Sequence, residues 1–379
     1  MSNKEWTMER TLNIEGFLYI PPHTIVKNPS IKFINGKITK IERRDTPPFH
    51  EKGCLFPPLV NAHVHLDFPH PIYSTDFVSW IEKIILKENS SRGYTKKTIK
   101  ILNNSRKLGI LHLCDITREL EYPLSVYGCQ PFYEIIGDED AEVPELPEGF
   151  MLSPHAVYST SPRLIKEAKN RFKNRLFMMH ASESKEEVKL VQGKPNQIEE
   201  RIYPLVKRKK PFDGVFPSPI ALLEHFSLLD EKMILVHCIE ATPKDIELIA
   251  RRGSKVVICP RSNLYLNGGM ADVPAFIREG ITVAIGTDGL GSTPNLNLWE
   301  EARLLYLYFK GKIKPEKILE MLTVNGLNAV GRKPFDEATF LLFDIKEPKG
   351  IEELAFTILF QAEELIKRGY FKGKELIFS

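Results

Sequence analysis

The sequence predicts an α/β fold, a (β/α)8 TIM barrel accompanied by a small β domain built from both ends of the chain. Eight short apolar runs alternate with amphipathic segments between residues 58 and 332, which is the pattern of the β-α units of a barrel. Residues 1–57 and 333–379 show strand-like alternation instead, and we expect them to form one composite β domain. Polar residues follow the apolar runs, as they do at the functional end of such a barrel.

Strand patterns begin in residues 11–20 and 30–44, with the sequences TLNIEGFLYI and SIKFINGKITKIERR. The Asn35-Gly36 pair in the second segment predicts a β-hairpin, because both residues tolerate the positive φ that a two-residue turn requires. Strand patterns return in residues 339–345 and 370–378, with the sequences TFLLFDI and YFKGKELIF. These four segments are the strands expected in the β domain.

The apolar runs of the barrel are short enough for strands and are bounded by turn residues. They lie at residues 59–66, 110–116, 124–135, 149–157, 175–181, 233–238, 255–260 and 281–288. The stretch STSPRLIKEAKNRF after the fourth run predicts a capped amphipathic helix, since Ser-Pro precedes residues with helical spacing. The interval 182–232 is too long for a plain connection, and it is expected to contribute helices over the barrel mouth.

Composition argues against several classes of protein. The 379 residues carry a net charge of only +3, and the short basic run at 207–210 is expected to be a solvated helix end rather than a nucleic-acid surface. The five cysteines are an odd number without a C-x-x-C pair, which favours a reduced compartment. The N-terminus lacks an apolar region, and no apolar run reaches about 18 residues. We expect a soluble cytoplasmic protein with no membrane or nucleic-acid partner.

Half of the ten histidines fall where predicted barrel strands end. They are His63, His65, His155, His180 and His237. His63 and His65 are two residues apart on a strand, so their side chains face the same side and can share a cation. Taken singly, His180 or His237 also fits the polar end of a core strand, and Asp288 fits a turn before glycine. Together, three histidines and one aspartate at one barrel mouth predict a site for one divalent metal ion, zinc or ferrous iron.

Five motifs in this order resemble the metal-dependent amidohydrolase superfamily. They are HVH at 63–65, HASE at 180–183, VHC at 236–238, CPRSNLYLNGG at 259–269 and GTDG at 286–289. The similarity runs from about Phe56 to Gly331. It implies a distorted (β/α)8 TIM barrel with a flanking domain, so the β domain from the two chain ends is expected to be a small β-sandwich.

Within the superfamily, the sequence is most similar to the aminohydrolase (deaminase) branch. Its fourth strand carries SPHAVYS, without the lysine common in binuclear members, so the resemblance implies one metal ion. His180 and Glu183 form the H-x-x-E of this branch, which combines a ligand with an acid. The stretch from His65 to Ile85, with an acid after HxH and a later F-x-x-W, looks most like the aminofutalosine deaminases. The branch also includes the S-adenosylhomocysteine deaminases.

The resemblance implies hydrolytic deamination with release of ammonia. The metal ligands that it implies are His63, His65, His180 and Asp288. The cation would lower the pKa of its bound water to around 7, and the hydroxide would attack the carbon that bears the amino group. Glu183 is expected to carry a proton to the ring nitrogen and then to the leaving amine, and His237 to orient the hydroxide. Asp288 is expected to accept the proton of the water.

The implied substrate is a purine or purine nucleoside, with 6-amino-6-deoxyfutalosine of menaquinone biosynthesis as the first choice. The expected substrate contacts are His155, Tyr158, Glu88, Arg92, Ser262 and Asn263. His155 and Tyr158 resemble the His-x-x-Tyr of this branch. Glu88 and Arg92 follow the first strand, where an acid holds ribose hydroxyls in related deaminases, but they also fit ordinary helix-surface charges. Ser262 and Asn263 fit either the pocket wall or a turn cap. Asp115 and Glu134 are expected either to orient ligands or to be polar residues of the barrel interior.

Two other functions remain open. One is another hydrolysis within the superfamily, of an amidine, a cyclic amide or a carbon–halogen bond. The other is a silent barrel that acts as a scaffold, which the retention of the ligands, Glu183 and His237 disfavours. The zinc-dependent cytidine deaminases are excluded because H-x-E with P-C-x-x-C is absent, and zinc proteases because HExxH is absent. The resemblance is also compatible with a homodimer.

Overall fold

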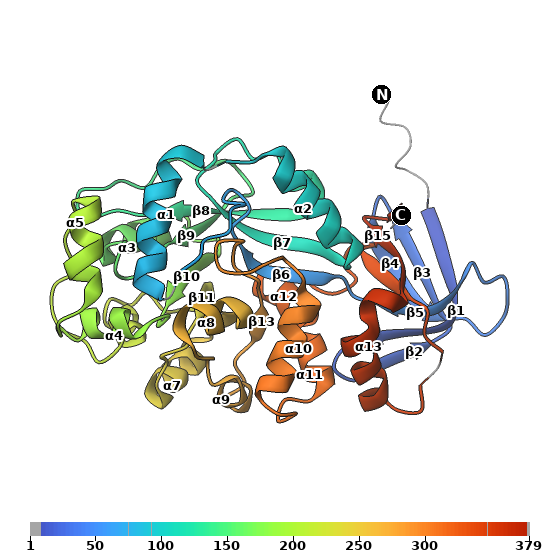
Figure 1. Ribbon diagram of the computed structural model, residues 1–379. Helices are drawn as coiled ribbons and strands as arrows, with labels where there is room; N and C mark the ends of the chain where they lie inside the picture. The colour runs from blue at the N-terminus through green and yellow to red at the C-terminus, as the bar shows by residue number, and fades with distance from the viewer. Residues whose placement is uncertain (1–8, 75, 92, 347, 377–379) are drawn as a thin grey trace. The chain divides into compact units, whose positions relative to one another are not determined.

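The computed structural model describes residues 9–74, 76–91, 93–346 and 348–376, with the side chains of 87–91 excepted (Figure 1). The chain divides into two compact units. One consists of Ala62–Ile101 and Leu113–Leu296, and the other of Met1–Asn61, Leu102–His112 and Asn297–Ser379. The predicted domain limits at 57/58 and 332/333 stay a prediction.

Eight strands form one sheet in the order of the chain, and all eight predicted runs contribute one strand each. The strands are β6 (Leu59–Val64), β7 (Ile110–Thr117), β8 (Cys129–Ile135), β9 (Met151–Pro154), β10 (Phe177–Ala181), β11 (Met233–His237), β12 (Lys255–Ile258) and β13 (Val283–Ile285). Neighbours from β7 to β13 pair in parallel. The third strand begins later than predicted, because residues Ser125–Tyr127 form a 3-10 turn that ends at Gly128 in the left-handed conformation.

Two backbone hydrogen bonds bring the first and last strands of this sheet together. The N–H groups of Thr287 and Asp288 both donate to the carbonyl oxygen of His63, each at 3.1 Å. The predicted TIM-barrel class is therefore confirmed. Strands such as β10 and β11 are buried at every position, which explains their continuous apolar runs, since a parallel sheet of a barrel is covered on both faces.

Helices and short turns connect these strands. They are α1 (Phe77–Ser91), α2 (Lys96–Lys107), α3 (Pro162–Arg171), α4 (Lys185–Val191), the π-helix η2 (Ile198–Ile202), α5 (Tyr203–Val206), α6 (Pro219–His225), α7 (Pro243–Arg252), α8 (Pro260–Asn267) and α9 (Val273–Arg278). The predicted cap of α3 is present: the Ser161 side chain accepts the N–H of Leu164, and Pro162 occupies the first turn, where its missing N–H costs nothing. The long interval 182–232 contributes α4, η2, α5 and α6, as expected.

The second unit contains the strands of both chain ends. They are β1 (Glu9–Ile20), β2 (Thr24–Lys27), β3 (Pro29–Ile34), β4 (Lys37–Arg43), β5 (Glu51–Phe56), β14 (Phe340–Phe343), β15 (Ile366–Phe371) and β16 (Lys374–Leu376). They form one mixed sheet in which the first half of β1 pairs with β3 and its second half with β5, while β5 continues to β14. The expected pairing of the two chain ends is therefore confirmed.

The core of this unit collects side chains from both halves of the mixed sheet, including Ile14, Ile31, Leu55 and Leu342. The predicted hairpin joins β3 to β4, with Asn35 at φ 52° and Gly36 at φ 76°. The unit also contains α10 (Leu298–Tyr308), α11 (Pro315–Leu322), α12 (Val324–Ala329) and α13 (Ile351–Leu365). The strand patterns did not indicate α13, which lies between β14 and β15 in the sequence.

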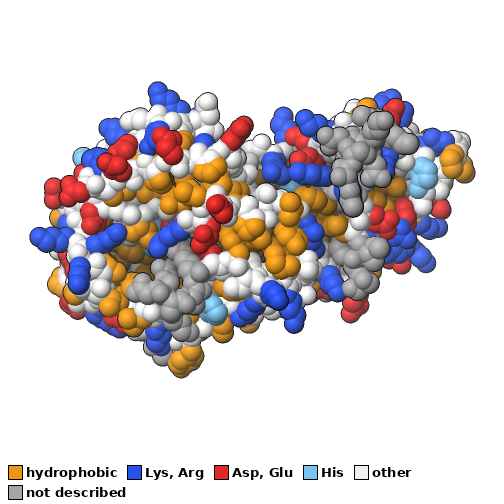
Figure 2. Space-filling model, turned by 90° about the horizontal axis from the view of Figure 1, so that it is seen from above, with side chains coloured by type: hydrophobic (Ala, Val, Ile, Leu, Met, Phe, Trp, Pro, Cys, Tyr) orange, Lys and Arg blue, Asp and Glu red, His pale blue; other side chains and the backbone are white. Residues whose placement is uncertain are grey.

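The surface agrees with the balanced composition. On the face drawn in Figure 2, basic and acidic side chains are interspersed, with hydrophobic side chains among them. Among the described residues, no helix combines the length and the apolar character that crossing a membrane requires.

Gly286 is needed where β13 approaches β6. A Cβ atom at this position would lie 2.8 Å from both the N and O atoms of His63 and 2.9 Å from its Cβ atom. These distances are shorter than any ordinary carbon contact, and two of the three atoms belong to the backbone. The absence of a side chain at 286 therefore permits the hydrogen bonds that bring Asp288 to His63.

Replacing Gly286 by alanine should force the two strands apart. We expect Gly286→Ala to lower the free energy of unfolding by about 1–3 kcal/mol, because backbone must move to accept the methyl group. Urea denaturation measures this change. Gly350→Ala is the matched control, since Gly350 has extended backbone and open space around its missing side chain. Equal stability of the two variants would contradict the role of Gly286.

Candidate active site

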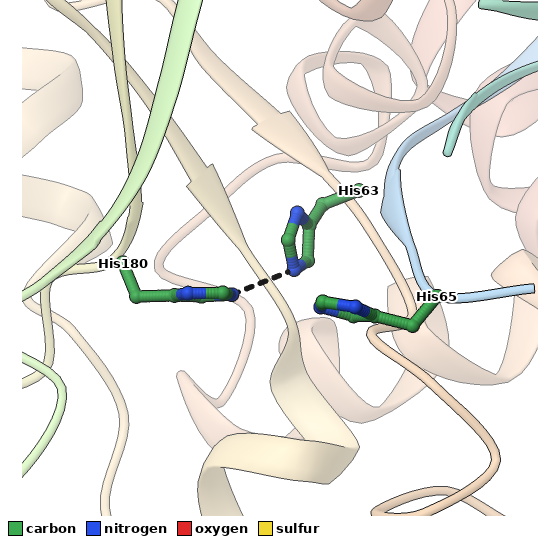
Figure 3. Close-up of side chains that lie close together, drawn as sticks. All are labelled: His63, His65 and His180. Carbon is green, nitrogen blue, oxygen red and sulfur yellow. Dashed lines mark hydrogen bonds between the residues drawn. The ribbon is translucent and has the colours of Figure 1, made fainter. Parts of the chain in front are cut away.

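Three histidines converge at the C-terminal ends of β6 and β10. His63 and His65 come from β6 and the residue after it, and His180 comes from β10 (Figure 3). One ring nitrogen from each lies within 4.8 Å of the others. The Nε2 atoms of His63 and His180 are 3.2 Å apart. Two nitrogens bound to one tetrahedral cation at 2.0–2.1 Å would lie about 3.3 Å apart, so this spacing suits a shared metal ion.

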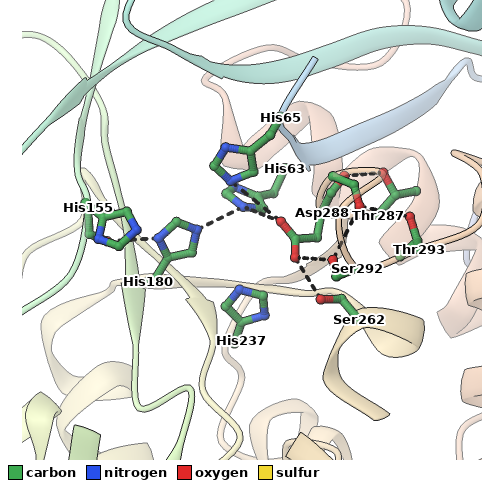
Figure 4. Close-up of polar contacts among 12 residues, drawn as sticks. His63, His65, His155, His180, His237, Ser262, Thr287, Asp288, Ser292 and Thr293 are labelled. Carbon is green, nitrogen blue, oxygen red and sulfur yellow. Dashed lines mark hydrogen bonds and ion pairs between the residues drawn. The ribbon is translucent and has the colours of Figure 1, made fainter. Parts of the chain in front are cut away.

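Asp288 presents one carboxylate oxygen to these histidines. Its Oδ1 atom lies 3.7 Å from Nε2 of His63 and 3.6 Å from Nε2 of His65 (Figure 4). Its Oδ2 atom accepts hydrogen bonds from the Oγ atoms of Ser262 and Ser292, both at 2.7 Å. The two serines therefore fix the carboxylate so that one oxygen faces the three rings.

The second nitrogen of His180 is also engaged. His180 Nδ1 donates to the carbonyl oxygen of His155 at 3.0 Å, which leaves the lone pair of Nε2 directed toward His63. Metal-binding histidines are commonly oriented in this way, by a hydrogen bond from the ring nitrogen that does not bind. Three imidazole nitrogens and one carboxylate oxygen form a donor set that zinc and ferrous iron both accept. The residues present therefore fit a divalent cation.

Burial and mutual contact set the charges of these groups. Burial lowers the pKa of His180 well below its usual value, and the neighbouring imidazoles lower it further. Burial would raise the pKa of Asp288, but His63, His65 and His237 more than offset this effect, and the net pKa lies well below the usual value. A neutral imidazole and an ionised carboxylate are the states in which these side chains bind metal.

Glu183 and His237 form a second pair beside the ligands. His237 Nε2 lies 3.6 Å from Glu183 Oε1, and His237 Nδ1 donates to Asn263 Oδ1 at 2.8 Å. Burial lowers the pKa of His237 to about 4, so its ring is neutral near pH 7. Burial raises the pKa of Glu183 well above its usual value, and the charges of Asp288 and Glu187 raise it further. Glu183 therefore keeps its proton to a higher pH than an ordinary glutamic acid does.

The ends of three strands have unusual backbone conformations. Ser182, His237, Cys238 and Asp288 all have positive φ, between 49° and 73°. Such left-handed conformations are unfavourable for residues other than glycine, and they concentrate at functional sites, where surrounding contacts impose them. Glu187, for example, accepts the backbone N–H of Glu183 at 2.7 Å and so stabilises the turn after β10. The strain sets the direction in which each side chain leaves its strand.

Comparison with known proteins identifies the family. The sequence profile of the Amidohydrolase family matches residues 54–335, which is most of the chain. The chain belongs to the amidohydrolase family. This agrees with the resemblance found in the motifs, and the protein is a hydrolase that acts on carbon–nitrogen bonds.

Several deaminases are similar to this amidohydrolase in sequence. A 5-methylthioadenosine/S-adenosylhomocysteine deaminase of Pyrococcus abyssi is 26% identical over 355 residues, which cover 82% of this chain and 78% of that protein. A 5'-deoxyadenosine deaminase of Methanocaldococcus jannaschii is 31% identical over 203 residues, which cover 51% of this chain and 44% of that protein.

Solved structures support the fold of the amidohydrolase. The Helicobacter pylori aminofutalosine deaminase in complex with methylthio-coformycin matches with a TM-score of 0.78 at 19% identity, covering 97% of this chain and 100% of that chain. An adenosine deaminase from Xanthomonas campestris with bound zinc matches with a TM-score of 0.72 at 19% identity, covering 96% and 92%.

A cavity of about 450 Å³ opens onto the candidate metal ligands of the amidohydrolase. Its wall includes His65, His180, Glu183, His237 and Asp288. Trp80 and neighbouring isoleucines of α1 form one apolar side, and η2 with α5 forms another. Trp80 also donates from Nε1 to the carbonyl oxygen of Gly291 at 2.8 Å, which attaches α1 to the loop after β13.

Only some of the predicted substrate contacts line the cavity. His155 and Tyr158 line the cavity. Ser262 and Asn263 are not among its lining residues: Ser262 donates to Asp288, and Asn263 accepts the hydrogen bond of His237. Their role as substrate contacts stays a prediction. Arg92 and the side chain of Glu88 lie outside the described residues.

Sequence analysis missed three polar residues of the site. Arg118 and Arg208 line the cavity, and Ser292 holds Asp288. Arg118 directly follows the last residue of β7, so the strand-end rule would have found it. Arg208 belongs to the basic run after α5, and its side chain is both partly exposed and part of the cavity wall.

Asp115 and Glu134 also have distinct positions. Asp115 accepts the backbone N–H of Leu66 at 2.9 Å and the hydroxyl hydrogens of Tyr94 and Tyr122, both at 2.8 Å. It is not among the cavity-lining residues, and it holds the chain directly after His65. Burial and the charge of Asp67 raise the pKa of Asp115 to about 8. Glu134, in contrast, lines the cavity.

Removing one candidate ligand should remove the metal ion. We expect purified His63→Ala to hold far less metal than the unaltered protein, because the candidate site would lose one of its three nitrogen ligands. Elemental analysis after gel filtration measures the content. The matched control is His225→Ala, since His225 is exposed at the end of α6. Full metal content in His63→Ala would remove His63 from the ligand set.

Proposed function

We propose that this amidohydrolase is a metal-dependent deaminase of a purine nucleoside, with 6-amino-6-deoxyfutalosine as the first candidate substrate. The observation that carries this proposal is the pairing of Glu183 with His237 on the cavity wall, beside His65, His180 and Asp288. The sequence relatives from Pyrococcus and Methanocaldococcus support deamination of an adenosine derivative. The likeness to the aminofutalosine deaminase supports the fold in which that reaction takes place.

The proposed ligands are His63, His65, His180 and Asp288, and the proposed metal is zinc or ferrous iron. A divalent cation held by these residues would lower the pKa of a water molecule and so activate it near neutral pH. Oδ2 of Asp288 is engaged by Ser262 and Ser292, so Oδ1 is the oxygen that can accept the proton of that water.

Glu183 is the proposed proton carrier. Hydrolysis adds the oxygen of water to the carbon that bears the amino group, and the adjacent ring nitrogen gains a proton. The carbon–nitrogen bond to the amino group then breaks, and the departing amine needs a second proton to leave as ammonia. A buried carboxyl with a raised pKa can both accept and deliver protons, which suits Glu183 for these transfers.

His237 is proposed to orient the attacking water. Because Nδ1 donates to Asn263, the neutral ring keeps its lone pair on Nε2, which faces Glu183 and the cavity. It can therefore accept a hydrogen bond from the water. The cavity volume lies within the range that small-molecule sites occupy, and His155 and Tyr158 offer polar groups beside a mainly apolar wall.

A role in menaquinone biosynthesis follows only if 6-amino-6-deoxyfutalosine is the substrate. The five cysteines are free and buried, which supports a reducing compartment such as the cytoplasm. The homodimer stays a prediction.

The experiment that tests the proposal is ammonia release from a panel of purines. Stripped protein reloaded with zinc or with ferrous iron is offered 6-amino-6-deoxyfutalosine, S-adenosylhomocysteine, methylthioadenosine, 5'-deoxyadenosine, adenosine and guanine. We expect ammonia from the nucleosides with either metal and the highest kcat/KM with 6-amino-6-deoxyfutalosine. Protein left without metal is the control.

The outcomes separate the candidate functions. Ammonia without preference for 6-amino-6-deoxyfutalosine would keep the deaminase and reject the first substrate. No ammonia from any purine, with about one metal ion per chain, would reject purine deamination. The hydrolysis of a cyclic amide or of an amidine would then be the function to test.

Glu183 can be tested without disturbing the metal. We expect Glu183→Gln to keep its metal and lose turnover by about 10²–10⁴-fold, because glutamine cannot carry the proton. Steady-state kinetics and metal content together measure this. Glu186→Gln, three residues further and partly exposed, should keep near-normal turnover. Near-normal turnover in Glu183→Gln would contradict the role of Glu183 as proton carrier.

A further inference from the structure

One ring nitrogen of the candidate ligand His63 contacts a methionine. His63 lies on β6 and Met178 lies on β10, and both residues are fully buried. The Nδ1 atom of His63 is 3.2 Å from the sulfur atom Sδ of Met178, which is within hydrogen-bond distance. The proposed deamination gives this methionine no role, so the contact calls for an explanation of its own.

The contact crosses the interior of the barrel. Strands β7, β8 and β9 separate β6 from β10 in the order of the sheet, so β6 and β10 lie on opposite sides of an eight-stranded barrel. Met178 and His180 are two residues apart on β10, and their side chains therefore point to the same face of the sheet. The strand β10 thus carries one candidate ligand and also the group that contacts a second candidate ligand, His63.

Met178 determines which nitrogen of His63 carries the hydrogen. A thioether sulfur has no hydrogen to donate, so Nδ1 of His63 must be the donor in this contact. A neutral imidazole that is protonated at Nδ1 keeps a lone pair on Nε2. Nε2 of His63 is the atom that lies 3.7 Å from Oδ1 of Asp288. Because the sulfur lies beside the other nitrogen of the ring, Met178 orients His63 and is not a further ligand of the same ion.

His180 is oriented in the same sense. Its Nδ1 atom contacts the carbonyl oxygen of His155 at 3.0 Å, and a carbonyl oxygen, like a thioether, can only accept. Both rings are therefore protonated at Nδ1, and the Nε2 lone pairs of His63 and His180 face each other across 3.2 Å. Two lone pairs at this distance repel each other unless a positive ion lies between them. Met178 and the carbonyl oxygen together thus favour a cation at this place.

A thioether is an unusual partner for a metal-binding histidine. The ring nitrogen that does not bind the metal usually donates to a carboxylate, a backbone carbonyl or water, and a carboxylate also makes the ligand more basic. Methionine sulfur is a weaker acceptor and carries no charge. Met178 can therefore orient the ring of His63 without adding a negative charge behind it.

We propose that Met178 is a positioning residue of the candidate metal site, which holds Nε2 of His63 toward a divalent cation by accepting the Nδ1–H of the same ring. The inference rests on the proposed function, because it takes His63 as a metal ligand. The effect of Met178 is on the affinity for the ion. Without the sulfur, binding of the ion at Nε2 would leave the Nδ1–H as a buried donor that lacks its acceptor, which is costly.

The first test measures the affinity for zinc by competition with a chromophoric chelator. We expect Met178→Leu to raise the Kd for zinc by roughly 3- to 10-fold, the factor for the loss of one ordinary hydrogen bond. Met179→Leu is the matched control, because Met179 is equally buried on the same strand and points to the opposite face. Its Kd should equal that of the unaltered protein. Leucine replaces methionine at nearly constant volume, so both variants should fold.

A second variant separates hydrogen bonding from packing. The amide oxygen of glutamine can accept the same Nδ1–H, so we expect Met178→Gln to bind zinc at least as tightly as the unaltered protein. A folded Met178→Gln that binds zinc as weakly as Met178→Leu would attribute the loss to packing and overturn the inference. Urea denaturation checks the fold of each variant. If Met178→Gln does not fold, the comparison of Met178→Leu with Met179→Leu decides the question.

The outcomes for the leucine pair are distinct from those for the proposed function. An unchanged Kd in Met178→Leu would overturn the inference and leave the deaminase in place. A loss of affinity that Met179→Leu shares to the same extent would also overturn it. Failure of the unaltered protein to bind zinc or ferrous iron would instead reject the proposed function.

The second test observes the hydrogen on His63 directly. Nitrogen-15 NMR of protein labelled only at histidine distinguishes a ring nitrogen that carries a hydrogen from one that does not. The signals of His63 are those that are missing from the spectrum of His63→Ala. In full-length protein stripped of metal, we expect Nδ1 of His63 to carry a hydrogen. A bare Nδ1 with the hydrogen on Nε2 would overturn the inference, because Met178 would then have no hydrogen to accept.

Discussion

The hydrogen bonds from Thr287 and Asp288 to the carbonyl oxygen of His63 are the constraint on which the site depends. They join the last strand of the barrel to the first, and in doing so they bring a carboxylate from one end of the sheet to two imidazoles at the other. Gly286 makes this approach possible because it has no side chain. The barrel closure and the candidate metal site are thus one structural feature.

Burial of so many ionisable groups in one place creates a second constraint. His180 and His237 are driven toward the neutral form and Asp288 toward the ionised form, while Glu183 is driven to hold its proton. Buried polar groups are costly unless each has a partner. The serines at Asp288, the amide of Asn263 at His237 and the carbonyl oxygen of His155 at His180 supply those partners. They also leave one atom of each functional side chain directed toward the others.

Away from the candidate metal ligands, the cavity wall is formed mainly by segments that connect the strands. Arg201 of the π-helix η2 donates to Glu82 and Ser79 of α1. Two segments that are far apart in sequence, η2 and α1, are therefore attached to each other. The Tyr265 hydroxyl of α8 accepts the N–H of Ser74 and donates to the carbonyl oxygen of Ile72, which attaches the segment before α1 to the helix that follows β12. The shape of the cavity therefore depends on contacts among the segments that connect the strands.

The sequence by itself determined the barrel, its eight strands and the convergence of His63, His65, His180 and Asp288. Buried parallel strands require continuous apolar runs, and the end of such a run is visible in the sequence. Tertiary structure alone decided that Ser262 and Asn263 support other side chains, that Arg208 enters the cavity, and that His237 and Asp288 adopt strained conformations. The physical reason is that periodicity encodes which residues are buried, whereas the direction of a side chain after a strand end depends on contacts with residues distant in sequence.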